Sequence, residues 1–197
     1  MQNYRKKIGA LAAVPALAAS NALAVSSTHT NNLVSDVDVD YLLHACYSSE
    51  YLFRGTDLGD DLTEVGIDAT TELNGWGLSA GVWSAAFDSP APDDINAETD
   101  FYGSVSKDLG FMTASVGYIY YWNIGSQGID NQEVSFAASR DFGFAKASLS
   151  YFLDVDSTAK GDTDGYTEFA LTRSFELSPC LALNVATNVG YLIEGGE

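Results

Sequence analysis

The chain has 197 residues, with nine Lys and Arg against 27 Asp and Glu, which gives a formal net charge of −18. Such a balance repels the phosphate backbone of nucleic acid, which is excluded as a natural partner, and it favours cations. Aromatic residues make up 12% of the chain and hydrophobic residues 46%, which is too much apolar material for a disordered acidic protein.

The N-terminal segment has the features of an export signal. Three basic residues at 5–7 precede an apolar run over 8–19, and Ala22 and Ala24 place small residues before a cleavage site. This order is typical of a secretory signal peptide, and the run is shorter than the ~20 residues of a spanning helix. The sequence therefore predicts a signal peptide over 1–24, a flexible stub over 25–36 and a β-barrel domain over 37–197.

The segment 37–55 carries the clearest pattern in the chain. Its odd positions are apolar or aromatic apart from one Ser, and its even positions hold every charge. Side chains alternate between the two faces of a strand, so one face would be apolar and the other polar. A soluble strand has about five or six residues, whereas a strand that crosses a bilayer has about nine to eleven. The segment predicts a transmembrane strand whose polar face lines a lumen.

The same alternation recurs along the chain. Asn74-Gly75 predicts a two-residue hairpin, and tight turns alternate with longer polar connections, of which 56–61 is the first. Soluble β-sandwiches also alternate, but long strands with two classes of connection favour an all-β, antiparallel, up-and-down transmembrane β-barrel. Bacterial barrels close with an even number of strands, so a count of about nine predicts that C-terminal closing strands are missing. The predicted strands are 37–55, 62–73, 76–87, 97–107, 111–122, 132–140, 144–154, 165–174 and 181–192.

Acidic side chains occupy the polar face of most predicted strands. Acids around a lumen raise the local cation concentration and repel anions, which predicts a cation-favouring, porin-like channel. Arg54 is expected to pair with acids on neighbouring strands such as Glu64 or Asp68, either as a dipole across a constriction or within a buried ionic network that plugs the barrel. The predicted pore-lining residues are Glu50, Arg54, Glu64, Asp68, Glu98, Asp100, Glu133 and Glu168.

Four short motifs carry a resemblance to a known family: Ser49-Glu50-Tyr51-Leu52-Phe53-Arg54-Gly55, Gly81-Val82-Trp83-Ser84, the segment from Glu98 to Gly103, and Val116-Gly117-Tyr118-Ile119-Tyr120-Tyr121. In order and spacing the chain resembles the TorF-type porin family of proteobacterial outer-membrane proteins. The resemblance implies an outer-membrane location and a pore, and it supplies no catalytic or binding residues. Glu50 departs from the Asn expected at its position, and the closing strands of the family are absent.

Other functions remain open on the sequence. A non-conducting structural or binding barrel with a plugged lumen is the alternative to the channel. An outer-membrane hydrolase is disfavoured because His44 and Ser48, on one polar face, would lie about 13 Å apart, too far for a base and a nucleophile. We predict no enzyme, no cofactor and no metal site. Whether divalent cations bind at the acidic loops stays open. Asp154, Asp156, Asp162 and Asp164 crowd one loop, but they do not follow the EF-hand spacing, so a solvated acidic loop is the default expectation.

Three cations recur just before predicted short turns: Lys107, Arg140 and Arg173. Long basic side chains near membrane interfaces extend toward lipid headgroups, although a solvated turn charge is the ordinary alternative. The predicted partners are outer-membrane lipid and small cationic or neutral solutes, and the oligomeric state stays open.

Overall fold

A computed structural model describes most of the chain as one antiparallel sheet. In it, ten strands follow one another in sequence order, each hydrogen-bonded to the next. The predicted all-β, up-and-down arrangement is therefore confirmed, with ten strands in place of nine. The predicted signal peptide lies outside the described residues, which are 25–34, 37–89, 96–124, 130–156, 164–178 and 181–194.

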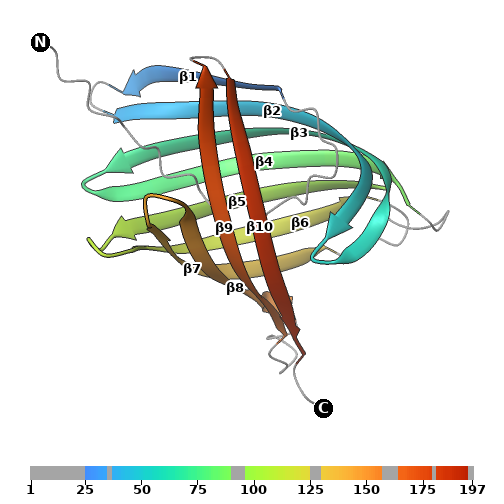
Figure 1. The fold of residues 1–197 in the computed structure, drawn as a ribbon. Helices are drawn as coiled ribbons and strands as arrows, with labels where there is room; N and C mark the ends of the chain where they lie inside the picture. Colours follow the sequence, from blue (N-terminus) through green and yellow to red (C-terminus); the bar gives the residue numbers. More distant parts are fainter. Residues whose placement is uncertain are drawn as a thin grey trace, which may run out of the picture.

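The sheet is strongly curled (Figure 1). β9 and β10 run in front of β2 to β6 at a steep angle in this view, so the strands wrap around an interior as a half-barrel, with β1 and β10 as its two edges. Within the described ranges, no helix is long and apolar enough to cross a membrane. The strands are β1 (Val25–Val34), β2 (Val37–Phe53), β3 (Thr56–Leu73), β4 (Trp76–Asp88), β5 (Ala97–Asp108), β6 (Thr113–Ile124), β7 (Asn131–Asp141), β8 (Lys146–Asp154), β9 (Gly165–Ser178) and β10 (Leu181–Ile193).

The first strand lies where the sequence predicts a flexible stub. Val25–Val34 pairs antiparallel with β2, from Val25 opposite Ala45 to Val34 opposite Val37. Its sequence is mostly polar and lacks the alternation that marks the other strands. The long β2 offers a row of backbone donors and acceptors, and pairing with them needs no apolar side chains. The stub prediction is wrong for these ten residues.

The connection between β2 and β3 is also tighter than predicted. Residues 56–61, expected as a polar loop, belong to β3 and pair with the end of β2. The turn is Arg54-Gly55, with φ of 51° and 83°. Positive φ at both central positions is the two-residue hairpin geometry that Asn-Gly favours, and Asn74-Gly75 adopts it as predicted, with φ of 53° and 72°. The missed turn has Arg at the position where Asn is usual.

The two faces of the sheet differ as the alternation predicts. Outward positions expose large apolar side chains, such as Val65 and Ile67, while Glu64 and Asp68, which flank them in sequence, are buried on the inside. Two aromatic clusters fill part of the interior: the first contains Tyr51, Leu62, Trp83, Ala85 and Phe87, and the second contains Ile119, Tyr121, Phe152 and Tyr166. Phe53 and Tyr102 pack against both clusters.

An irregularity near the end of β2 exchanges its two faces. Ser48 is buried, as an even position should be, but three residues later Tyr51 is buried and Glu50 is exposed. The pairing of β2 with β3 and of β3 with β4 both shift in this region, and Asp61 has a φ of 55°. A bulge inserts an extra residue and bends the strand. Beyond it, the side chains expected toward lipid point into the interior.

Candidate functional site

The interior contains two zones that differ in chemistry. The acid–aromatic zone lies near the strand ends that lead into the longer connections, and it brings together five of the predicted pore-lining acids. All five are 4–8% exposed: Glu64, Asp68, Glu98, Asp100 and Glu133.

Arg54 connects the hairpin turn to the opposite wall of this zone. Its guanidinium binds Glu133 on β7 through two hydrogen bonds of 2.5 and 2.8 Å. The guanidinium carbon also lies 4.6 Å from the ring centre of Phe152 on β8 and 4.5 Å from that of Tyr166 on β9. The prediction that Arg54 pairs with Glu64 or Asp68 is wrong, because the hairpin bends inward and carries the side chain past its neighbouring strands.

The backbone at the turn explains how the side chain is presented. A residue other than Gly in the left-handed region costs about 1–2 kcal/mol, and Arg54 occupies that region with a φ of 51°. Strain of this size persists where surrounding contacts fix the conformation. The bidentate pair with Glu133 and the flanking rings supply such contacts, since charge-assisted, two-point bonds are among the stronger ones in proteins.

Aromatic side chains donate hydrogen bonds to the buried acids. Trp83 Nε1 donates to Glu64 at 2.8 Å, and the Tyr51 hydroxyl donates to Glu98 at 3.0 Å. The Tyr102 hydroxyl donates to Asp68 at 2.6 Å. The Tyr121 hydroxyl donates to Glu133 at 2.8 Å. Buried charges are costly unless they are hydrogen-bonded or paired, so these donors are what allows the acids to lie inside.

The sequence pattern assigned these aromatic residues to predicted strands but did not indicate that they bind the buried acids. Trp83, Tyr102 and Tyr121 stand on the polar face of their predicted strands, where an aromatic side chain breaks the alternation. Trp and Tyr each carry a polar donor on an apolar body, and that donor seeks a partner when buried. An aromatic residue among inward-facing acids was therefore the available signal. Tyr51 gave no such signal, because only the bulge turns it inward.

Some polar atoms of the zone are buried without a hydrogen bond. They are His44 Nε2, Asp68 Oδ2 and Asp100 Oδ1. His44 Nε2 and Asp68 Oδ2 face each other at 3.4 Å, close enough for an ion pair if the imidazole is protonated. Gly81 leaves the room that Tyr102 and Asp68 need, since a Cβ there would lie 2.5 Å from the Tyr102 ring. In the described part of the chain, no group of three or more His, Cys, Asp or Glu side chains could hold a metal ion.

Two predicted pore-lining residues lie outside this arrangement. Glu50 is exposed because the bulge turns it away from the interior. Glu168 is half-buried on β9 and accepts a hydrogen bond of 2.7 Å from Asn188 on β10. The structure thus brings six of the eight predicted residues together, including Arg54, and leaves these two aside.

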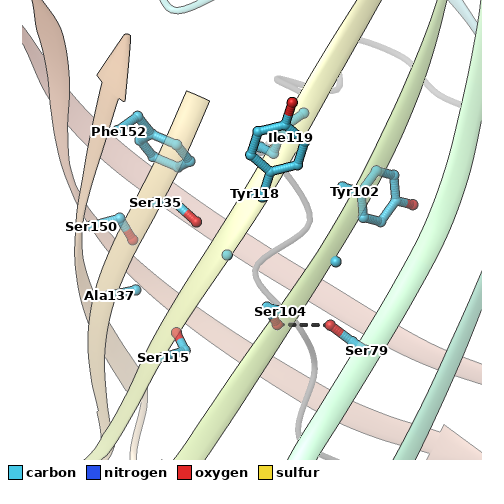
Figure 2. A pocket seen from close by; sticks show the side chains of 12 residues that line it. Ser79, Tyr102, Ser104, Ser115, Tyr118, Ile119, Ser135, Ala137, Ser150 and Phe152 are labelled. Carbon is cyan, nitrogen blue, oxygen red and sulfur yellow. Dashed lines mark hydrogen bonds between the residues drawn. The ribbon is translucent and has the colours of Figure 1, made fainter. Parts of the chain in front are cut away.

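The second zone of the interior, the hydroxyl zone, surrounds an uncharged cavity lined by small side chains together with Tyr102, Tyr118, Ile119 and Phe152. Figure 2 shows its serines on neighbouring strands around a cavity of about 30 Å³, with a hydrogen bond of 2.7 Å between Ser79 and Ser104. A water molecule needs about 10–15 Å³ by this kind of measure, so the cavity suits one or two waters. The zone consists of Ser79, Ser104, Ser115, Ser135 and Ser150, with Gly103 and Gly117 between them.

Comparison with known families places the chain in a family to which no function is assigned. A family described as "Bacterial protein of unknown function (Gcw_chp)" matches residues 36–193, which include all of β2 to β10. The chain belongs to the Gcw_chp family. Searches of curated proteins and of solved structures find no match. Membership in Gcw_chp assigns no activity, and the resemblance to TorF-type porins stays a prediction.

Proposed function

We propose that this Gcw_chp protein is an outer-membrane β-barrel that forms a narrow, cation-favouring channel, with the β2–β3 hairpin constricting its lumen. The observation that carries the proposal is the outward face of the sheet. Every strand from β2 to β9 has at least one large apolar side chain on this face that is between 42% and 54% exposed. Examples, one from each of these strands, are Leu43, Val65, Trp76, Phe101, Val116, Phe136, Leu149 and Phe169.

Lipid is the environment that suits such a face. Soluble monomers rarely expose a contiguous apolar patch larger than a few hundred Å², because each Å² of apolar surface in water costs about 25 cal/mol. The buried acids support the same conclusion, since they lie on the concave side, whereas the exposed apolar side chains lie on the convex side. A soluble sandwich would bury its apolar face against a second sheet.

The interior supports a channel for cations more than one for anions. The acid–aromatic zone holds five carboxyl groups around one guanidinium, and the hydroxyl zone carries no charge. Acids that line an enclosed path attract cations and exclude anions. Because Arg54 reaches from the turn to three facing strands, it would set the narrowest point of that path.

A plugged, non-conducting barrel is the second candidate. It is favoured by the hydrogen bonds that Trp83, Tyr51, Tyr102 and Tyr121 give to the acids, since small barrels often fill their interiors with side chains. In that case the acid–aromatic zone would stabilise the fold and would carry no solute.

Single-channel recording in planar bilayers distinguishes the two. We expect small conductance from the unmodified protein and larger, cation-selective steps from Arg54→Gln and from Glu133→Gln, each of which breaks the ion pair. Arg140→Gln changes an exposed arginine on the outward face and is the control. Its single-channel conductance and ion selectivity should equal those of the unmodified protein. Silence in all variants with retained β-sheet circular dichroism would support the plugged barrel, and failure of every variant to enter a bilayer would overturn the membrane proposal.

A further inference from the structure

On the outward face of the sheet, positive charges lie at the end with the short turns and negative charges lie at the opposite end. In the described strands, the outward positions next to the short turns carry cations, one each on β5, β7 and β9: Lys107, Arg140 and Arg173. Exposed carboxylates also occur at this end, for example Asp40 and Glu72, but they belong to the polar register of their strands. At the opposite end, the exposed charges of the described residues are carboxylates: Glu50, Asp57, Asp60, Asp61, Asp88 and Asp130. Exposed large apolar side chains lie between these two ends and also at the short turns, where Phe142 and Leu109 are examples.

Each cation lies over an exposed aromatic ring. Lys107 Nζ is 5.0 Å from the ring centre of Trp76. The guanidinium carbons of Arg140 and Arg173 are each 5.2 Å from a ring centre, that of Phe142 and that of Phe175 respectively. Rings at this position are typical of the aromatic girdles that mark membrane interfaces. The same end therefore presents apolar rings and positive charges together.

Two of the cations are also held by the neighbouring turn. Lys107 Nζ donates to the Gly75 carbonyl oxygen at 2.8 Å, and Arg173 donates to the Gly143 carbonyl oxygen at 2.7 Å. These bonds fix the side chains along the rim of the sheet. A lysine has three donor hydrogens and an arginine five, so each keeps donors for a further acceptor.

The carboxylates that follow Lys107 and Arg140 in sequence do not share the outward face with these cations. Asp108 and Asp141 follow Lys107 and Arg140 in sequence and therefore take the opposite face of their strands. Each accepts a hydrogen bond of 2.7 Å from the backbone nitrogen of its turn glycine, Gly110 or Gly143. Their carboxylates are engaged in shaping the turns.

We infer that Lys107, Arg140 and Arg173 bind the phosphate groups of phospholipids in the leaflet next to the short turns. The inference rests on the proposed membrane location and adds a lipid class to it. Phosphodiester oxygens accept hydrogen bonds from basic side chains and carry the complementary charge, while Trp76, Phe142 and Phe175 sit at the boundary between headgroups and acyl chains. The outward face at the acidic end would repel the same headgroups, so the binding also fixes orientation.

Partition into vesicles of defined composition tests the inference. The purified protein would be mixed with vesicles of phosphatidylcholine alone or with about one third phosphatidylglycerol, and the folded, vesicle-bound fraction would be measured against lipid concentration. We expect tighter binding to the anionic vesicles, and a loss of roughly fivefold in that preference for each cation removed in K107Q, R140Q and R173Q. Because the attraction is electrostatic, added salt should weaken it.

Lys146→Gln is the matched control, since Lys146 lies at the same end of the sheet but on its inward face, opposite Thr172. It should keep the preference of the unmodified protein. Equal binding to both vesicle types, or a preference that survives the triple substitution, would overturn the inference and leave the membrane proposal standing. Failure to bind either vesicle type would overturn both.

Discussion

The acid–aromatic zone and the hydroxyl zone line the same curled sheet, yet they are built on different principles. In the first, large side chains from facing strands meet across the interior, as Arg54 and Glu133 do at 2.5 Å. In the second, small side chains on adjacent strands form a short hydrogen bond, as Ser79 and Ser104 do. The first zone joins opposite walls of the half-barrel, whereas the second leaves them apart.

This difference indicates where stability and selectivity reside. Buried charges make strong demands on their surroundings, because each lost partner leaves an uncompensated charge inside. Serine hydroxyls make weak bonds that water can replace. Substitutions in the acid–aromatic zone should therefore have large effects and those in the hydroxyl zone small ones.

The largest effect is expected from Arg54→Met, which keeps a long side chain and removes the charge. Glu133 would then be buried without its cation, which typically costs about 3–5 kcal/mol of unfolding free energy. The measurement is urea unfolding of the folded protein in detergent micelles. Arg140→Met, at an exposed arginine, is the control and should stay within about 0.5 kcal/mol. Equal effects at the two sites would contradict a special role for Arg54.

A smaller loss is expected from Trp83→Phe, which removes the Nε1 donor from Glu64 and keeps an aromatic ring. Leaving a buried acceptor without its donor costs about 1–3 kcal/mol. Trp122→Phe provides the comparison, because Trp122 is 47% exposed on the outward face. The same unfolding measurement applies, and the prediction fails if the Trp122 variant loses as much as the Trp83 variant.

Gly55→Ala tests the hairpin that links the two walls. Gly55 has a φ of 83°, and a Cβ added to it would meet no atom within 4 Å, so only backbone strain opposes the change. We expect a loss of about 1–2 kcal/mol. Alanine at Gly103, whose φ is not positive and whose Cβ would meet the Ser79 carbonyl oxygen at 3.1 Å, separates strain from crowding. An unchanged midpoint for Gly55→Ala would argue against the tight turn.

The smallest effect is expected in the hydroxyl zone. Ser104→Ala removes one weak hydrogen bond and should cost about 0.5–1.5 kcal/mol. A double-mutant cycle with Ser79→Ala would isolate the contribution of the bond itself. A coupling energy as large as the effect of Arg54→Met would mean that the two zones do not differ in the way described above.

The sequence predicts which residues face the site, but it does not predict which of those residues bind one another. Alternation places Glu64, Asp68, Glu98, Asp100 and Glu133 on the inward face, and the structure buries all five. The partner of Arg54 escaped prediction because Glu133 is 79 residues away and on another wall. The inward position predicted for Glu50 is wrong for a local reason, since the bulge near this residue exchanges the two faces of the strand.

The sequence by itself determined nine of the ten strands, their antiparallel order and the separation of acids from exposed apolar residues, because a period of two follows directly from strand geometry. It also determined the Asn74-Gly75 turn, since few other residue pairs adopt positive φ so readily. Only the tertiary structure decided that the β2–β3 hairpin bends inward and that aromatic donors meet the buried acids. Those contacts depend on the curl of the whole sheet, which brings together residues that no local pattern relates.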